Sequence, residues 1–225
     1  MNTAILKMIQ VCDSLFPIGA FTLSNGWETL VAQNQLRSST DLKEYVSSFL
    51  DILPYNDLGT MMLAYAHSDE KEYIKELDSL AIALKAPSEI RVGSEKLCRR
   101  FLKIWQDHKE YERLTWYFQK IKERRVDGCH AIAVGLYAKE IGLPQKIAGE
   151  IYGYSLLTAV VTNVVKTVPL SQMDGQKILA ESQEQIGSAV AKAEKLERDD
   201  LGVGGTAFDI AGMNHEILYC RLYMS

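Results

Sequence analysis

The chain has 225 residues, of which 47% are hydrophobic, 9% aromatic and 24% charged. A chain of this length and composition can bury a hydrophobic core, so we expect one stable globular domain. Lys and Arg together number 25 and Asp and Glu 29, which gives a net charge of −4. Proteins that bind nucleic acid usually carry a basic excess, so a helical regulator acting on nucleic acid is disfavoured.

The cysteines also exclude some classes of protein. Cys12, Cys98, Cys129 and Cys220 form no C-x-x-C pair, so neither a disulfide scaffold nor a zinc ribbon is expected. The N-terminal residues carry Lys7 within a short amphipathic pattern and lack the long apolar core of a secretory signal. We therefore expect a cytoplasmic protein with reduced thiols.

Apolar residues recur at helical spacing along the chain, whereas the two-residue alternation of strands is scarce. The sequence predicts an all-α fold: a single-domain helical bundle of about ten helices around a buried central helix. The first helix is expected at residues 4–12. The segment that follows, 13–21, contains Pro17 and Gly19, which interrupt a helix.

This segment, 13–21, is unusually apolar for a connection. Its large apolar side chains are Leu15, Phe16, Ile18 and Phe21. Such side chains are costly to leave in water, so the segment either packs under the bundle or forms a contact surface.

Two of the next helix starts resemble a capping box. Asn25 with Glu28 would start a helix near residue 26, and Asp41 with Glu44 would start one that Pro54 ends. Further helices are expected at 57–67, 71–84, 88 to about 108, 110–121 and 129 to about 141. The outer side of 88–108 alternates in charge and is interpreted as solvated. The aromatic residues of 110–121 could stack on bases, but in an acidic chain we interpret them as core.

The central helix is predicted at 149–168, because residues 151–165 carry no charge. The run is bounded by Glu150 and Lys166 and contains polar residues, which favours a buried helix over a membrane span. Gly149 and Gly153, four residues apart, would let another helix approach closely.

The C-terminal part begins with a helix expected from about 172 to 194. Residues 196–208 combine four charges with three glycines, which is typical of a mobile loop. Asp209 is a possible N-cap for a last helix. Apolar residues then repeat at seven-residue spacing, the pattern of an a/d seam, at Ile210, Met213, Ile217, Cys220 and Met224. We therefore divide the domain into a helical bundle at 1–195 and a mobile loop with a partner-binding C-terminal helix at 196–225.

The sequence contains no recognisable catalytic motif. It has no phosphate-binding loop, and His215-Glu216 begins the H-E-x-x-H pattern of zinc proteases but meets Tyr219 where the second His belongs. Cys129 and His130 are neighbours in a predicted helix and point about 100° apart, a poor geometry for a nucleophile and its base. We expect no catalytic, cofactor-binding or metal-ligating residues, and an interaction protein is favoured over an enzyme.

Four blocks of this chain, in order, resemble the UreF family of urease accessory proteins. They are DSLFPIGAFTLSNGWE (13–28), GCHAIAVGLYAKEIGL (128–143), NVVKTVPLSQMDGQKIL (163–179) and DIAGMNHEILYCRLYMS (209–225). Trp27 stands where Leu is usual, Lys166 where Arg is also common, and Tyr223 where Phe is usual. These differences leave the resemblance intact over nearly the whole chain.

The resemblance implies an all-α protein without catalytic activity of its own, commonly a homodimer. Such a protein is an adaptor that works with a UreD/UreH-type scaffold and a UreG-type GTPase to load nickel into apo-urease. Nickel and GTP would then be bound by the partners and not by this chain, and neither nucleic acid nor a membrane is expected as a partner. The alternative is an all-α metallochaperone that binds nickel directly through His and Cys.

Candidate partner-binding residues lie first in the N-terminal part and at the end of the central helix. The apolar segment supplies Phe16, Pro17 and Ile18. Glu28 either caps its own helix or pairs with a cation of a partner. Lys166 ends the uncharged run, where the helix dipole favours a cation, and could contact an acidic surface of the GTPase.

The tail supplies the other candidates. Met213, Ile217 and Tyr223 would anchor a partner, and His215, Glu216 and Arg221 would add polar specificity. The alternative is a terminal helix docked on its own bundle. His130 is interpreted as a residue at the start of a helix, packed near the central helix.

Overall fold

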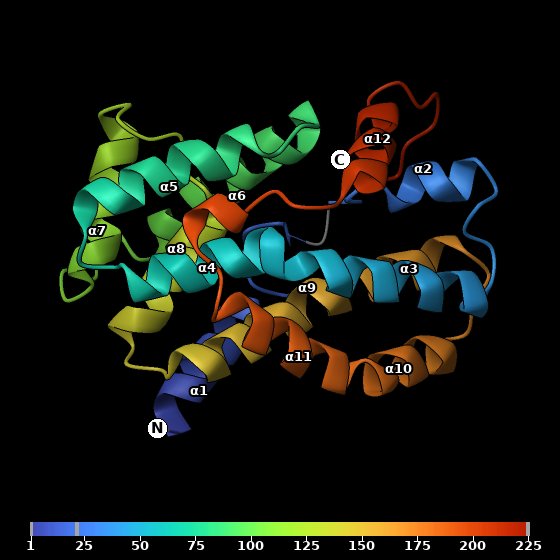
Figure 1. Ribbon diagram of the computed structural model, residues 1–225, viewed down its shortest axis with the longest axis horizontal. Helices are drawn as coiled ribbons and strands as arrows, with labels where there is room; N and C mark the ends of the chain where they lie inside the picture. The colour runs from blue at the N-terminus through green and yellow to red at the C-terminus, as the bar shows by residue number, and fades with distance from the viewer. Residues whose placement is uncertain (1, 21–22, 224–225) are drawn as a thin grey trace.

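The structure is a computed structural model that describes residues 2–20 and 23–223. Within these ranges it consists of helices joined by turns and contains no strand, which confirms the predicted all-α class (Figure 1). The helices are α1 (Asn2–Cys12), α2 (Trp27–Ala32), α3 (Ser39–Ile52), α4 (Asp57–Ala66), α5 (Lys71–Ala83), α6 (Ser88–Ile104), α7 (Glu112–Lys122), α8 (His130–Glu140), α9 (Gln145–Thr167), α10 (Gln172–Glu181), α11 (Gln183–Ala193) and α12 (Thr206–His215), with 3-10 turns η2 (Leu53–Tyr55) and η3 (Arg198–Asp200).

Helices α4 and α8 form the centre of the bundle and pack with their backbones in contact. Gly135 of α8 lies against the carbonyl oxygen of Met61 in α4, and a Cβ at Gly135 would be only 2.4 Å from that oxygen. Every residue of α8 from Ala131 to Ala138 is buried. Because α6, α7 and α9 also contact α8, this helix is enclosed on all sides.

The helix predicted as central exists as α9 and begins before residue 149. It buries residues such as Leu157 and Val161, whereas Tyr154 of the same helix is 40% exposed. The helix enclosed all round is therefore α8, not α9. A Cβ at Gly149 would lie 2.9 Å from the Met62 sulfur, so this glycine does serve helix packing. No helix in the described part of the chain is long and apolar enough to cross a membrane.

The predicted boundaries of α3 and of the helix after Pro169 are wrong. The cap of α3 is Ser38, whose hydroxyl accepts the backbone N–H of Asp41 at 3.2 Å while the Asp41 carboxylate accepts the N–H of Ser38 at 2.9 Å. The helix predicted at 172–194 is divided at Ser182 into α10 and α11. The Ser182 hydroxyl donates to the Ile178 carbonyl at 2.7 Å, a back-bond that bends helices.

The start of α8 is held by a buried carboxylate of α5. Asp78 accepts the backbone N–H groups of Asp127 at 2.8 Å and Cys129 at 2.9 Å, together with the hydroxyl of Tyr117. Burial raises the pKa of Asp78, and these donors oppose that rise. Asp78 thereby satisfies the N–H of the N-cap residue Cys129 and those of the two residues before it, Asp127 and Gly128.

His130 begins α8, and its ring lies 6.3 Å from that of Tyr152 in α9, as predicted. Its Nε2 is buried and has no hydrogen-bond partner among the described residues. Burial lowers the pKa of His130 to about 4, so the ring is neutral at pH 7. His130 is therefore a packing residue of the core.

The contact between α4 and α8 predicts opposite effects of the same substitution at two glycines. Gly135→Ala should destabilise the protein by about 2–3 kcal/mol, because the new methyl group would overlap the Met61 backbone. Gly187→Ala, in α11, should stabilise it by about 0.5–1 kcal/mol, because a Cβ there meets no atom within 4 Å. Urea unfolding of both variants measures the difference, and equal stability of the two would contradict this packing.

Candidate partner-binding surface

The last helix is shorter than predicted. It starts after Gly205, whose φ of 89° is left-handed, so Asp209 lies in the first turn and is not the N-cap. It ends at His215, which leaves Ile217 and Cys220 beyond the helix. The predicted a/d seam is therefore wrong for 210–220, and its last member, Met224, lies outside the described residues.

The loop before α12 follows the surface of the bundle. It contains η3, after which Leu201 is buried. The backbone N–H of Gly202 donates to the carbonyl of Tyr55 at 2.8 Å. The loop thus reaches α12 through contacts with the start of α4.

His215 lies between two carboxylates at the end of α12. Its ring is fully buried, with Nε2 2.9 Å from Glu28 of α2 and Nδ1 2.6 Å from Glu89 of α6. Both ring nitrogens are therefore paired with carboxylate oxygens, one from α2 and one from α6. We call Glu28, His215 and Glu89 the carboxylate clamp.

Glu28 does not cap its own helix. The N-cap of α2 is Gly26 with a φ of 83°, no side chain caps this helix, and the capping box predicted from Asn25 and Glu28 is wrong. The Glu28 carboxylate instead accepts the backbone N–H groups of Leu222 at 2.6 Å and Tyr223 at 3.2 Å. Glu28 is only 6% exposed, so it holds the end of its own chain.

Further contacts tie residues 216–223, which we call the tail strap, to α2 and α6. Arg221 donates to Glu89 at 2.5 Å, and the backbone N–H and hydroxyl of Ser88 both donate to Glu216 at 2.8 Å. The Tyr223 ring meets the ring of the buried Trp27 edge-on, with centroids 4.8 Å apart. The described part of the strap accordingly lies beside α12 and α2 (Figure 1).

The polar groups of the tail face the bundle, and large apolar side chains face water. Ile217 is 82% exposed and Leu222 72% exposed, and Tyr219 is fully exposed. In α12, Ile210 and Met213 are about half exposed. Clusters of exposed apolar residues mark interaction surfaces, so this end of the molecule is the strongest candidate for one.

The apolar segment after α1 is mostly packed. Phe16 and Ile18 are buried, and the Phe16 ring lies 5.9 Å from that of Phe101 in α6. Pro17 is exposed, and Leu15 is 89% exposed. Leu15 and Pro17 are therefore the side chains of the described part of this segment that are open to a partner. Phe21 lies outside the described residues.

Lys166 is exposed in the last turn of α9, at the position predicted for it. No hydrogen bond or ion pair joins Lys166 to any residue of 216–223. The structure thus brings together Glu28, His215, Glu216, Arg221 and Tyr223, whereas Lys166 is separate from this group.

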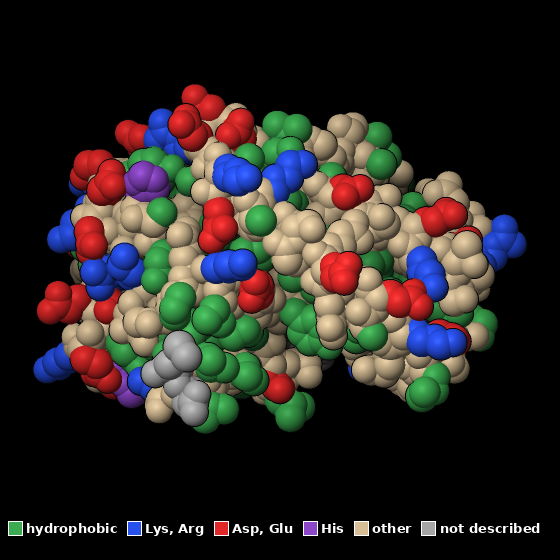
Figure 2. All heavy atoms as spheres, turned by 60° about the horizontal axis from the view of Figure 1, so that its bottom comes forward, with side chains coloured by type: hydrophobic (Ala, Val, Ile, Leu, Met, Phe, Trp, Pro, Cys, Tyr) green, Lys and Arg blue, Asp and Glu red, His purple; other side chains and the backbone are tan. Residues whose placement is uncertain are grey.

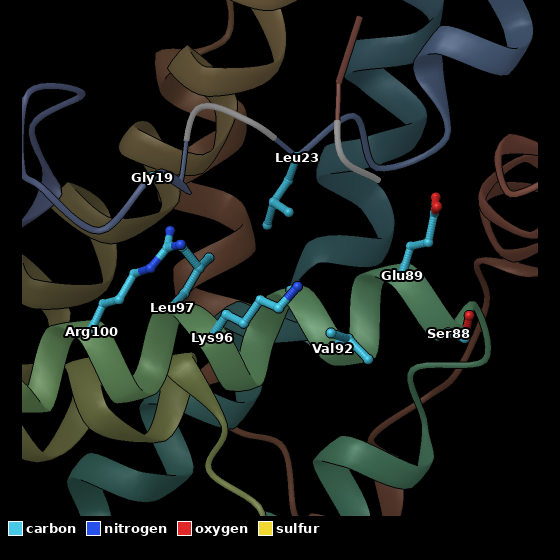
Figure 3. A pocket seen from close by; sticks show the side chains of 9 residues that line it. Gly19, Leu23, Ser88, Glu89, Val92, Lys96, Leu97 and Arg100 are labelled. Carbon is cyan, nitrogen blue, oxygen red and sulfur yellow. The ribbon is translucent and has the colours of Figure 1, made fainter. Parts of the chain in front are cut away.

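Sequence analysis missed the residues of α6 that complete the site. Ser88 and Glu89 hold the tail strap, and beside them α6, Gly19 and Leu23 line a groove of about 220 Å³ (Figure 3). These partners are 126 or more residues from the tail in sequence, so no local pattern signals them.

The residues of a possible metal site are dispersed. Among the described residues, no group of three or more His, Cys, Asp and Glu side chains is placed to hold a metal ion. Burial raises the pKa of the Cys129 thiol to about 11, which disfavours the thiolate that a metal requires.

The carboxylate clamp predicts that Glu28→Gln destabilises the tail. Loss of a buried charge opposite His215 should cost about 3 kcal/mol, and amide hydrogen exchange should rise first in residues 216–223. Glu44→Gln is the matched control, because it makes the same change at an exposed position of α3 outside the clamp and the strap. Unchanged exchange in the tail of the Glu28 variant would show that the clamp does not hold the strap.

Comparison with known proteins places this fold and tail in a family. The UreF family model matches residues 36–183. "Urease accessory protein UreF" of Haemophilus influenzae (strain PittEE) is 38% identical over 221 residues, covering 97% of this chain and 94% of the relative. The protein of the same name from Actinobacillus pleuropneumoniae serotype 5b (strain L20) is 37% identical, with 97% of each chain covered. That of Kocuria rhizophila is 33% identical over 227 residues, covering 98% of this chain and 97% of the relative. The chain therefore belongs to the UreF family of urease accessory proteins.

Proposed function

We propose that this protein is an adaptor in urease maturation that joins a UreD/UreH-type scaffold to a UreG-type GTPase and supports nickel insertion into apo-urease. The observation that carries the proposal is the tail strap, in which buried polar bonds fix the backbone while Ile217, Tyr219 and Leu222 point into water. A fixed apolar surface binds a partner at a lower entropic cost than a disordered tail.

The two candidate surfaces suit two partners. The apolar tail strap fits the scaffold, which would bury Ile217 and Leu222. Lys166 is exposed, and Met173 of α10, seven residues further along the chain, is 72% exposed. This cation and this apolar side chain would fit a surface of the GTPase that carries acidic and apolar residues. One adaptor could then hold both proteins at once, because these residues lie on different elements.

In this proposal nickel and GTP belong to the partners, and the chain has no catalytic step of its own. The alternative, direct nickel binding through Cys129 and His130, would require the fully buried Cys129 thiol to become accessible. Stoichiometric nickel binding by the purified chain that disappears on changing these two residues would favour the alternative.

We also propose that the protein acts in the cytoplasm as a homodimer. Helix α1 carries Leu6, 65% exposed, and Ile9, 47% exposed, on the side away from the bundle. Figure 2 shows apolar side chains gathered on the face around this helix, with charged side chains over much of the remaining view. Burial of this face between two copies would remove it from water.

The adaptor role is tested by co-expressing apo-urease, the scaffold and the GTPase in nickel medium, with and without this chain. We expect urease activity only when the chain is present, because the GTPase would otherwise not be recruited. Immunoblots should show equal amounts of apo-urease in both arms. Equal activation in the two arms would refute the adaptor role.

The tail strap predicts a binding defect without a folding defect. Ile217→Asp and Leu222→Asp should each weaken scaffold binding at least about tenfold, because a charge would enter an apolar interface. Val203→Asp, also at an exposed position, is the matched control and should bind normally. Pull-down with the scaffold measures binding, and circular dichroism measures helix content. Normal binding by both tail variants would show that the strap does not contact the scaffold.

A further inference from the structure

The groove beside the tail strap combines two cations with an apolar lining. Lys96 and Arg100, one turn apart on α6, both line the groove, and Arg100 extends toward Gly19. Leu23 projects toward α6 from the opposite side (Figure 3). Leu97 and Val92 add apolar surface. Gly93 allows Leu23 to approach α6 closely, because a Cβ at this position would lie only 2.9 Å from the Leu23 side chain.

The charges that line the groove are not balanced within it. Its acidic residue, Glu89, is matched by His215 and Arg221, one at each carboxylate oxygen. Arg100 donates to a neutral group, the Ile18 carbonyl, at 2.8 Å. No ion pair joins Lys96 to any residue that the structure describes. The groove therefore presents positive charge beside apolar side chains.

The tail strap and the groove share a boundary. Ser88 and Glu89, which bind Glu216 and Arg221 of the strap, also line one end of the groove. A protein seated on the strap would therefore reach the groove without a change in the bundle.

We propose that this groove receives an acidic side chain, flanked by an apolar residue, from the same partner that binds the tail strap. This proposal rests on the proposed function, since it assigns a second contact to the scaffold. The carboxylate would lie between Lys96 and Arg100, whose planar guanidinium suits a carboxylate, and the apolar neighbour would contact Leu23 and Val92. A volume of about 220 Å³ accommodates a side chain of this kind and not a folded element.

The proposal is tested by the affinity of the purified scaffold protein for the full-length chain, measured by biolayer interferometry at low and high salt. Lys96→Glu should weaken binding about tenfold or more, because it would oppose a carboxylate, and should reduce the salt dependence. Lys103→Glu is the matched control. It makes the same charge change at an exposed position of the same helix, two turns from Lys96 and outside the groove.

The outcomes separate the two proposals. Weaker binding of Lys96→Glu, with less than about threefold change for Lys103→Glu and unchanged circular dichroism in both, supports the groove. If the two variants weaken scaffold binding equally, or if neither weakens it, the proposed role of the groove is wrong and the adaptor role is unaffected. Failure of the unchanged chain to bind the scaffold overturns both.

Discussion

The close approach of α4 and α8 is the constraint on which the rest of the bundle depends. Gly135 places the α8 backbone against the Met61 carbonyl, and no other residue could do so without moving one helix. With α8 enclosed, the helices around it have one face to bury and one to expose, which gives α6 and α9 their mixed character. The start of α8 is fixed in turn by Asp78, because its carboxylate accepts the N–H groups of the N-cap residue Cys129 and of Asp127 before it.

At the edge of the molecule, the carboxylate clamp holds the structure through buried polar contacts and not through close helix packing. Buried polar groups need hydrogen-bond partners, and both ring nitrogens of His215 have one only with Glu28 and Glu89 in place. Since Glu28 also accepts two backbone N–H groups of the strap, loss of one carboxylate would weaken several contacts together. The tail is thereby held through its polar atoms, so its apolar side chains remain available to a partner.

The proposed functional surface thus combines a helix of the bundle with an irregular segment that follows the last helix. Helix α6 supplies Ser88 and Glu89 from the bundle, and the strap supplies the exposed apolar residues. This arrangement explains how Glu28, a buried residue, could alter partner binding without touching the partner. It also gives the groove its positive charge, because the clamp occupies Glu89 and leaves Lys96 and Arg100 for a carboxylate.

The sequence by itself determined the helical class, most helix ranges and the family resemblance, because helical periodicity and motif blocks are short-range properties. Helices α4 and α5 lie where the pattern predicts them, and the four blocks lie in a chain that belongs to the UreF family. Only the tertiary structure decided which helix is enclosed, that α12 stops at His215, and what Glu28 does. His215 and Glu28 are 187 residues apart, and His215 and Glu89 are 126 apart. Local sequence patterns do not contain information on contacts between residues so far apart in the chain. The sequence around Glu28 therefore resembles a helix cap, although its carboxylate binds the end of the described chain.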